Sequence, residues 1–463
     1  MMVLLDEMPT EPIGWVRFPI ESVTLQTPLT QEEQMAVKRE EQDVKRRWRI
    51  PPPVLRGPEA PGPEGLAVLE EMRSELGLLL WKTLRSILLW GDVSPAERKD
   101  LFPPELVNRR QAEILAILPD ERHELRAPLE ELLSILSSPA KADPERIGLA
   151  CTRIASWTEG EGHANTALEF LQAAAVSCPA NPRFALSVMR TSRDLAHYPR
   201  AEAWFHRVVG LARQCRDWDT YIRAYIAHGT MMLRKGALPA ARRSFLKAYR
   251  RATRQGLKEV RTMALHDLFV VEYHLGNEEE GDQYAAQAVD LYGPDHERFP
   301  RIAHDIAFVW LMKGAYQNAM EVLSGVLPRL PDSAQATVNG TLARAAAGAG
   351  NAEMFENARR RLQTSPDNVG LAEAWVEVAR GALILGRLEE AREAAMKAES
   401  LARRRLEGQV RFMAESVLDA INAEEKAAIH LRELPAAPRS ASRDQLTVQI
   451  VSGLRESAAT ARR

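Results

Sequence analysis

Apolar residues recur every three or four positions over most of residues 146–407, which is the spacing of one face of an α-helix. The helical segments come in pairs, and a small residue stands between the two members of each pair. Successive small residues lie 34 to 40 positions apart, and they serve here as markers: Gly162, Ala196, Gly236, Gly276, Gly314, Gly350 and Gly386. This recurrence predicts seven helical hairpins in succession.

Each hairpin shares a pattern of small and large side chains around its marker. In the third hairpin, Gly229 precedes Gly236 by seven residues, Ala241 follows it by five, and Phe245 stands four further on. The marker must tolerate a positive φ angle in a tight turn. Small residues let the two helices cross closely, and the large apolar residue fills the space between neighbours. Because one hairpin cannot bury both of its faces, we expect the hairpins to stack.

This pattern resembles the tetratricopeptide repeat. Gly229, Gly236, Ala241, Phe245 and Ala248 stand where the consensus of that family has small residues, a turn glycine and an aromatic residue. The resemblance implies an all-α fold, a right-handed α-α superhelix formed by residues 146–407. It also implies a non-catalytic scaffold or adaptor that binds a peptide or protein segment in its concave groove.

The segments before the repeats differ from them in composition. Residues 1–63 combine many prolines with a charged run and are expected to be extended or disordered. Residues 64–140 are expected to form a small N-terminal helical domain without the repeat period. Its apolar residues from Leu66 to Leu88 recur at helical spacing and predict one long helix.

Two segments follow the repeats. Residues 408–430 predict a terminal helix that caps the array with one polar face. Residues 431–463 are rich in Ala, Ser and Arg and are expected to form a disordered tail. Within this tail, Leu446 to Leu454 is an apolar island. It is either a short linear motif or a residual turn on the surface.

Charge and cysteine content narrow the class of protein. With 61 Lys+Arg and 63 Asp+Glu the formal net charge is −2, which argues against nucleic acid as a chain-wide partner. Three scattered cysteines do not provide a disulfide framework. The most apolar stretch, Leu76 to Trp90, contains Lys82 and Arg85 and is too short to span a membrane. We therefore expect a cytoplasmic protein that has no membrane segment.

We find no motif that carries catalytic or cofactor chemistry. The sequence contains no phosphate-binding GxxxxGK[ST] loop, and the glycines near Gly350 belong to a hairpin turn. The ten histidines form no HExxH or HxxxH pair, so no metal site is expected. We accordingly expect no enzyme, no cofactor and no bound metal.

The resemblance also assigns a ligand-binding surface. In tetratricopeptide arrays, certain positions of the first helix of each hairpin line the concave groove. In this sequence they include a basic and aromatic set: Arg183, Arg190, Arg193, Arg223, His266, Tyr273, Arg301, His304, Phe308, Arg344 and Arg380. Arginine binds carboxylates with a planar fork, so the set favours an acidic peptide or a terminal carboxylate. The alternative is that these arginines are only a solvated face.

A second function is compatible with the same architecture. Long-repeat arrays often follow a DNA-binding domain, so the chain could be a transcriptional regulator or signal-peptide sensor that acts on nucleic acid through residues 64–140. The basic spot in the best candidate helix is Asn108 to Arg110. No short helix pair with a basic second helix is evident there. The identity of the partner and the oligomeric state stay open.

Overall fold

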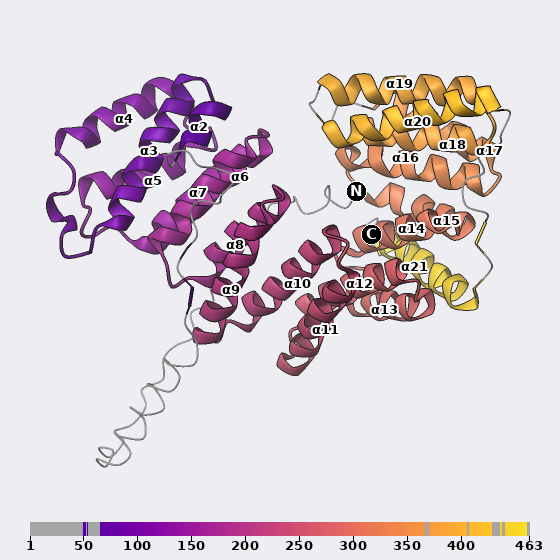
Figure 1. Ribbon diagram of the computed structural model, residues 1–463, viewed down its shortest axis with the longest axis horizontal. Helices are drawn as coiled ribbons and strands as arrows, with labels where there is room; N and C mark the ends of the chain where they lie inside the picture. Colours follow the sequence, from indigo (N-terminus) through magenta and orange to yellow (C-terminus); the bar gives the residue numbers. More distant parts are fainter. Residues whose placement is uncertain are drawn as a thin grey trace, which may run out of the picture. The chain divides into compact units, whose positions relative to one another are not determined.

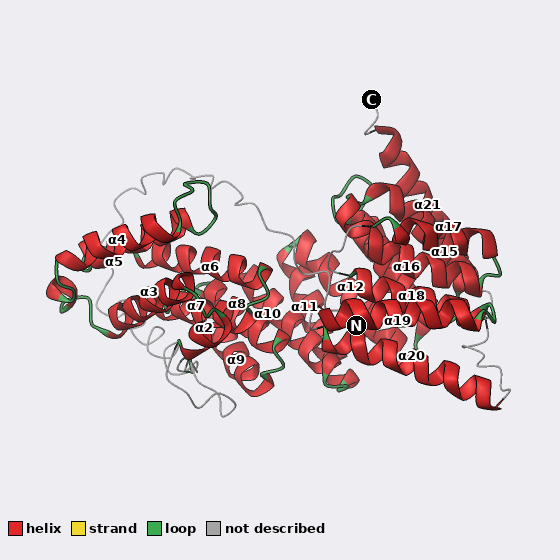
Figure 2. Ribbon diagram, turned by 90° about the horizontal axis from the view of Figure 1, so that it is seen from above, coloured by secondary structure: helices red, strands yellow, loops and turns green. Residues whose placement is uncertain are grey.

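The computed structural model describes residues 50–51, 53, 65–365, 370–404, 407–427, 436–437 and 440–460. Within these ranges every regular element is a helix, as Figure 2 shows, and the expected all-α fold is confirmed. Except for residues 50, 51 and 53, the segment 1–63 lies outside the described residues. The chain forms two compact units, unit 1 up to Gln255 and unit 2 from Gly256 onward, and each is described by itself.

Unit 1 begins with a group of helices that do not repeat and continues with three helical hairpins (Figure 1). The first group consists of α2 (Leu66–Glu71), α3 (Glu75–Asp92), η1 (Arg98–Asp100), α4 (Glu105–Ile117) and α5 (Arg126–Ser137). The hairpins consist of α6 (Pro144–Gly160) and α7 (Ala164–Ser177), α8 (Pro182–Asp194) and α9 (Tyr198–Gln214), and α10 (Trp218–Arg234) and α11 (Leu238–Gln255).

The single helix expected from Leu66 to Leu88 is wrong, because the chain breaks between α2 and α3. The Ser74 hydroxyl accepts a hydrogen bond from the backbone N–H of Gly77 at 3.2 Å and caps the start of α3. Gly77 also leaves room for the Met72 carbonyl, since a Cβ atom at Gly77 would lie 1.8 Å from that oxygen. The apolar spacing runs on through the break and therefore could not reveal it.

The helices between residues 64 and 140 share a hydrophobic core with the first hairpins. One hydrophobic core runs from Val68 in α2 to Ala227 in α10. The Glu71 carboxylate accepts hydrogen bonds from the backbone N–H groups of Asn165 at 3.1 Å and Thr166 at 2.7 Å, and so caps the start of α7. The N-terminal helices are thus part of the same body as the first hairpins.

Unit 2 contains four hairpins, a further helix and a C-terminal helix. Its elements are α12 (Lys258–Leu275), α13 (Glu278–Tyr292), α14 (Phe299–Met312), α15 (Tyr316–Val326), η2 (Leu327–Arg329), α16 (Asp332–Gly348), α17 (Ala352–Gln363), α18 (Leu371–Ile384), α19 (Leu388–Arg404), α20 (Gly408–Ala427) and α21 (Ala441–Thr460). The expected terminal helix is α20, which packs on α19; residues 428–430 lie outside the described residues.

The hairpin turns lie where the markers predict them. All seven markers stand between the two helices of a hairpin and have positive φ angles, from 59° at Ala196 to 85° at Gly162. The predicted pairing of small and large residues is also present. A Cβ atom on Gly229 would lie 2.3 Å from the ring of Phe245, so the glycine leaves room for that ring in its present position.

The expected disordered tail is wrong for residues 441–460, which form helix α21. This helix packs against α13, α14 and α15, as Figure 1 shows for the yellow C-terminal segment. Leu446, Ile450 and Leu454 lie at four-residue spacing and are each at most 2% exposed. The apolar island of the sequence is therefore the buried stripe of an amphipathic helix, whose burial stabilises it.

Candidate functional site

The eleven predicted binding residues lie on the first helices of successive hairpins, and they divide between the two units. Four belong to α8 and α10 of unit 1, and seven belong to α12, α14, α16 and α18 of unit 2. In unit 2 these four helices pack side by side in chain order. The surface that they form together is called the first-helix face of unit 2 below.

In unit 1, Arg183 and Arg223 already have partners within the chain. The Arg183 Nε atom lies 3.5 Å from the Asp217 carboxylate at the start of α10, and the Arg183 side chain is 63% exposed. The Arg223 Nε atom donates to the Asp219 carboxylate at 2.7 Å, one helical turn away. These are surface ion pairs, which contribute little to stability.

Arg193 is buried and lies in a small cluster with Asp194 and Arg234. The Arg193 guanidinium donates two hydrogen bonds to the neighbouring Asp194 carboxylate, each at 3.0 Å. Arg234 of α10 donates to the same carboxylate at 2.7 Å. Arg190, on the same helix, is half-buried. Arg183, Arg193 and Arg223 are therefore engaged in ion pairs within the unit.

In unit 2, Asp305 of α14 connects two of the predicted histidines. His304 Nδ1 lies 3.2 Å from Asp305 Oδ1, and His266 Nε2 on α12 lies 3.4 Å from Asp305 Oδ2. The ring of Phe308, one turn further along α14, stacks on that of His304 with centroids 6.4 Å apart. One carboxylate therefore orients two imidazoles that come from neighbouring first helices.

The surroundings of Asp305 and His266 shift the pKa values of both side chains. Burial opposes the negative charge of Asp305, but the hydrogen bond from His304 and the positive charges of His266, His304 and Arg301 hold the pKa of the carboxyl below its ordinary value. Burial lowers the pKa of His266, against the effect of Asp305 and with that of Arg301. Asp305 is therefore ionised near neutral pH.

A second ion cluster lies on α16 and α18. Arg344 Nη1 donates to Glu377 Oε2 at 2.9 Å, and Arg380 Nη1 donates to Glu377 Oε1 at 2.7 Å. The side chains of Arg344 and Glu377 are only 8% and 4% exposed. Two predicted arginines thus share one buried carboxylate, and this pairing fixes α18 against α16.

Glu373, one turn before Glu377 on α18, has no such partner. It makes no hydrogen bond or ion pair with any residue that the structure describes. Burial, together with repulsion from Glu377, raises the pKa of its carboxyl. Glu373 therefore lies beside the cluster of Arg344, Glu377 and Arg380 without being bonded to it.

Tyr273 does not lie on the first-helix face. Its hydroxyl donates to the Asp282 carboxylate of α13 and accepts a hydrogen bond from the indole N–H of Trp310 at 2.9 Å. Arg443 and Ser442 of α21 complete this buried polar cluster, and Ser442 lies 3.4 Å from Asp282. Tyr273 therefore connects the hairpins with α21 and is not a groove residue.

Sequence reasoning missed Asp305 and Glu377. Neither stands at a position that the family uses for ligands, yet each connects two first helices. Their acidic character beside predicted basic residues was the available signal: Asp305 directly follows His304, and Glu377 precedes Arg380 by three residues. A helix places residues three positions apart, such as Glu377 and Arg380, on nearly the same surface.

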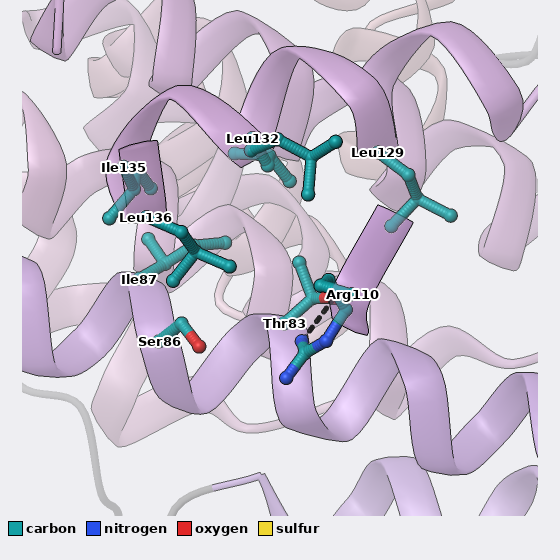
Figure 3. A pocket seen from close by; sticks show the side chains of 9 residues that line it. Thr83, Ser86, Ile87, Arg110, Leu129, Leu132, Ile135 and Leu136 are labelled. Carbon is teal, nitrogen blue, oxygen red and sulfur yellow. Dashed lines mark hydrogen bonds between the residues drawn. The ribbon is translucent and has the colours of Figure 1, made fainter. Parts of the chain in front are cut away.

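A small crevice lies in unit 1. It is lined mainly by leucine and isoleucine side chains of α3 and α5 (Figure 3). Arg110 is buried there and donates to the Thr83 hydroxyl at 3.2 Å. It also pairs with Glu113 at 3.1 Å. Arg110, part of the basic spot considered for nucleic acid, therefore lies in the interior.

Two further searches of the described residues had negative results. No group of three or more His, Cys, Asp or Glu side chains among them is arranged to hold a metal ion. Within the same ranges, every helix is too short or too polar to cross a membrane.

No protein-family model and no curated protein matches the sequence. Among solved structures, a Pyrococcus horikoshii signal transduction ATPase (STAND) with a tetratricopeptide repeat sensor is 15% identical, with a TM-score of 0.45, 76% of this chain covered and 54% of that one. This chain thus spans about half the length of that protein.

Two other solved structures are similar in the same general way. Aspartyl phosphate phosphatase F from Bacillus subtilis is 13% identical with a TM-score of 0.41, over 75% of this chain and 95% of that one. The TPR2AB domain of yeast Sti1 in a complex with pHSP90 is 14% identical with a TM-score of 0.26, over 58% and 98%.

Proposed function

We propose that this chain is a non-catalytic interaction scaffold that binds a protein or peptide segment on the first-helix face of unit 2. The observation that carries the proposal is the way Asp305 and Glu377 fix polar side chains of neighbouring first helices in place. A surface whose side chains are already ordered loses little entropy when it binds a segment. The half-buried Phe308 beside them supplies an apolar contact.

The pairing of the arginines also bears on the expected acidic ligand. Five of the seven predicted arginines form ion pairs with carboxylates of this chain: Arg183, Arg193, Arg223, Arg344 and Arg380. An acidic segment would have to compete with those carboxylates. We therefore propose the interaction surface without assigning an acidic partner to it. We also propose a cytoplasmic location, because all three cysteines are free thiols.

The test is affinity purification of binding proteins from the native host with the full chain as bait. Phe308→Glu places a charge on the first-helix face, whereas Met396→Glu makes a comparable change on α19, where Met396 is 56% exposed. We expect partners to be lost with Phe308→Glu and retained with Met396→Glu. Circular dichroism of both variants controls for folding.

A purified partner then allows the contact to be located. Hydrogen exchange of the complex should show protection in peptides from α14 and α18. If a folded Phe308→Glu variant binds the same proteins as the unmodified chain, the first-helix face of unit 2 is not the interaction surface.

A further inference from the structure

One face of α11, the last helix of unit 1, carries a row of positive charges. The helix contains basic residues at six positions and neither Asp nor Glu. Four of the six are exposed and stand three or four positions apart, and they are called the α11 row below: Arg243, Lys247, Arg250 and Arg254. At 1.5 Å per residue, the row runs about 16 Å along one side of the helix.

Within the part of the chain that the structure describes, the α11 row has no carboxylate partner. The side chains of Arg243, Arg250 and Arg254 form no hydrogen bond or ion pair there. The second helix α19 is different, because it intersperses acidic with basic residues and Arg403 pairs there with Glu399. Like charges one turn apart repel each other, so the α11 row destabilises its own helix until an anion lies against it.

Arg251, one turn beyond Lys247, is held against an aromatic surface beside the row. Its guanidinium carbon lies 3.6 Å from the centroid of the Trp218 ring and 6.0 Å from that of the Tyr221 ring, both on α10. Its side chain donates no hydrogen bond to any residue that the structure describes. A guanidinium that is already fixed over a ring loses little entropy when it binds, and its unused N–H groups require an acceptor.

Lys247 is fixed by α10 in the same way. Its Nζ atom donates to the Tyr225 hydroxyl at 2.7 Å and lies 4.2 Å from the centroid of that ring. Tyr225 in turn packs edge-on against Phe205 of α9, with centroids 5.1 Å apart. Two cations on this side of α11 are therefore positioned by a packed set of aromatic rings.

The arrangement favours a polypeptide over a nucleic acid as the anion. Single-stranded nucleic acids bind proteins by stacking bases on aromatic rings, but the rings of Trp218 and Tyr225 already have cations of this chain against them. The formal net charge of the chain, −2, is also unlike that of a nucleic-acid-binding protein. A row of about 16 Å matches about five residues of an extended polypeptide.

We propose that the α11 row and Arg251 bind an acidic segment of a partner polypeptide. Aspartate or glutamate side chains of that segment pair with the row, and Arg251 offers a planar fork to one of the carboxylates. The site belongs to a second helix of unit 1. The inference therefore goes beyond the proposed function and does not depend on the first-helix face of unit 2.

The experiment uses a short fluorescein-labelled peptide in which Glu and Ser alternate, and a neutral analogue in which Gln replaces each Glu. Both are titrated with the full chain, and binding is followed by fluorescence anisotropy. We expect the Glu peptide to bind at least about tenfold more tightly than the Gln peptide. Its affinity should fall as salt is added, because salt screens exposed charges. Equal binding of the two peptides would overturn the inference.

Variants of the full chain locate the contact. Arg250→Gln/Arg254→Gln removes two charges of the row, and we expect it to weaken binding of the Glu peptide about tenfold. Arg251→Lys keeps the charge but loses the planar fork and should weaken binding about threefold. The matched control is Arg360→Gln/Arg361→Gln, which removes two exposed arginines at the end of the second helix α17. Circular dichroism checks that each variant is folded. Equal losses of affinity in the α11 and α17 double variants would show that only overall charge matters, and would overturn the inference.

Two further titrations test the kind of partner and the place of binding. A thymidine oligonucleotide with the same number of negative charges should bind more weakly than the Glu peptide. Tighter binding of the oligonucleotide that is lost in Arg250→Gln/Arg254→Gln would identify a nucleic-acid surface and overturn the assignment to a polypeptide. Phe308→Glu should leave binding of the Glu peptide unchanged. A loss in that variant would place the peptide on the first-helix face of unit 2 and overturn the inference.

Discussion

The first helices of the two units carry the same kinds of charged side chains but satisfy them differently. In unit 1, Arg223 pairs with a carboxylate on its own helix, and the Arg183 side chain that reaches the next helix is 63% exposed. In unit 2, Arg344 and Glu377 join neighbouring first helices at 8% and 4% exposure. Unit 1 also joins two first helices through the cluster of Arg193, Asp194 and Arg234, but the Arg234–Asp194 pair is 22% and 33% exposed and so less buried than the pair in unit 2.

A second difference concerns the outer side of each unit. In unit 1 the described residues before α2 contact α9: Ile50 packs against Gly210, and Arg207 donates to the Pro51 carbonyl at 2.7 Å. In unit 2 the corresponding contact is made by a complete helix, α21. Segments from both flanks of the array thus contact second helices of their own unit.

The largest expected effect comes from removing α21 from its site. Ile450→Asp places a charge where the side chain is fully buried, so the helix should detach and the free energy of unfolding of unit 2 should fall by about 4 kcal/mol. Hydrogen exchange should accelerate in peptides of α13 and α15 and stay unchanged in α9. Val448→Asp, at a position that is 65% exposed on the same helix, is the control. Equal effects of the two variants would show that α21 is not held by its apolar stripe.

The next largest effect is expected when ion pairs are removed, and its size can be compared between the two units. Glu377→Gln leaves the buried Arg344 without its charge partner, and we expect the free energy of unfolding to fall by about 3 kcal/mol. Arg223→Gln removes an ion pair of unit 1 whose two side chains are 27% and 39% exposed, and we expect a loss of about 0.5 kcal/mol. Urea unfolding midpoints measure both. Losses of similar size would mean that the ion pairs of the two units do not differ in strength.

The hairpins were predictable from the sequence because each turn imposes a local constraint. A tight turn with a positive φ angle strongly favours glycine, and six of the seven markers are glycines. The site was only partly predictable, because its key pairs depend on which helices become neighbours. Arg344 and Glu377 stand 33 positions apart in the sequence, and only the packing of α16 on α18 brings them together.

The C-terminal helix α21 was also only partly predictable from the sequence. The spacing of Leu446, Ile450 and Leu454 was visible in the sequence, but the apolar surface that receives them belongs to α13 and α15. A composition rich in Ala, Ser and Arg says nothing about that surface. A short apolar stretch acquires a definite structure only when another element buries it.

A smaller effect tests how closely helices approach in the two units. A Cβ atom on Gly340 would lie 2.5 Å from the Cα atom of Ala374 in α18, so Gly340→Ala must move backbone and should cost about 2 kcal/mol. On Gly229 in unit 1 the obstacle is the Phe245 ring, which can rotate, and Gly229→Ala should cost about 1 kcal/mol. Thermal unfolding of the two variants shows which substitution lowers stability more. A reversed order would indicate that Phe245 is the more rigid obstacle.

The smallest expected effect is a pH dependence that originates in unit 2. Burial lowers the pKa of His266, and burial together with Lys313 lowers that of His274. Below the ordinary histidine pKa of about 6.5 the unfolded chain therefore binds more protons than the folded one, and stability falls as the pH falls through that value. We expect the free energy of unfolding to decrease by about 1 kcal/mol between pH 7 and pH 5. The double variant His266→Gln/His274→Gln should flatten this slope, because it removes both groups. A slope that persists unchanged in that variant would place the titrating groups elsewhere in the chain.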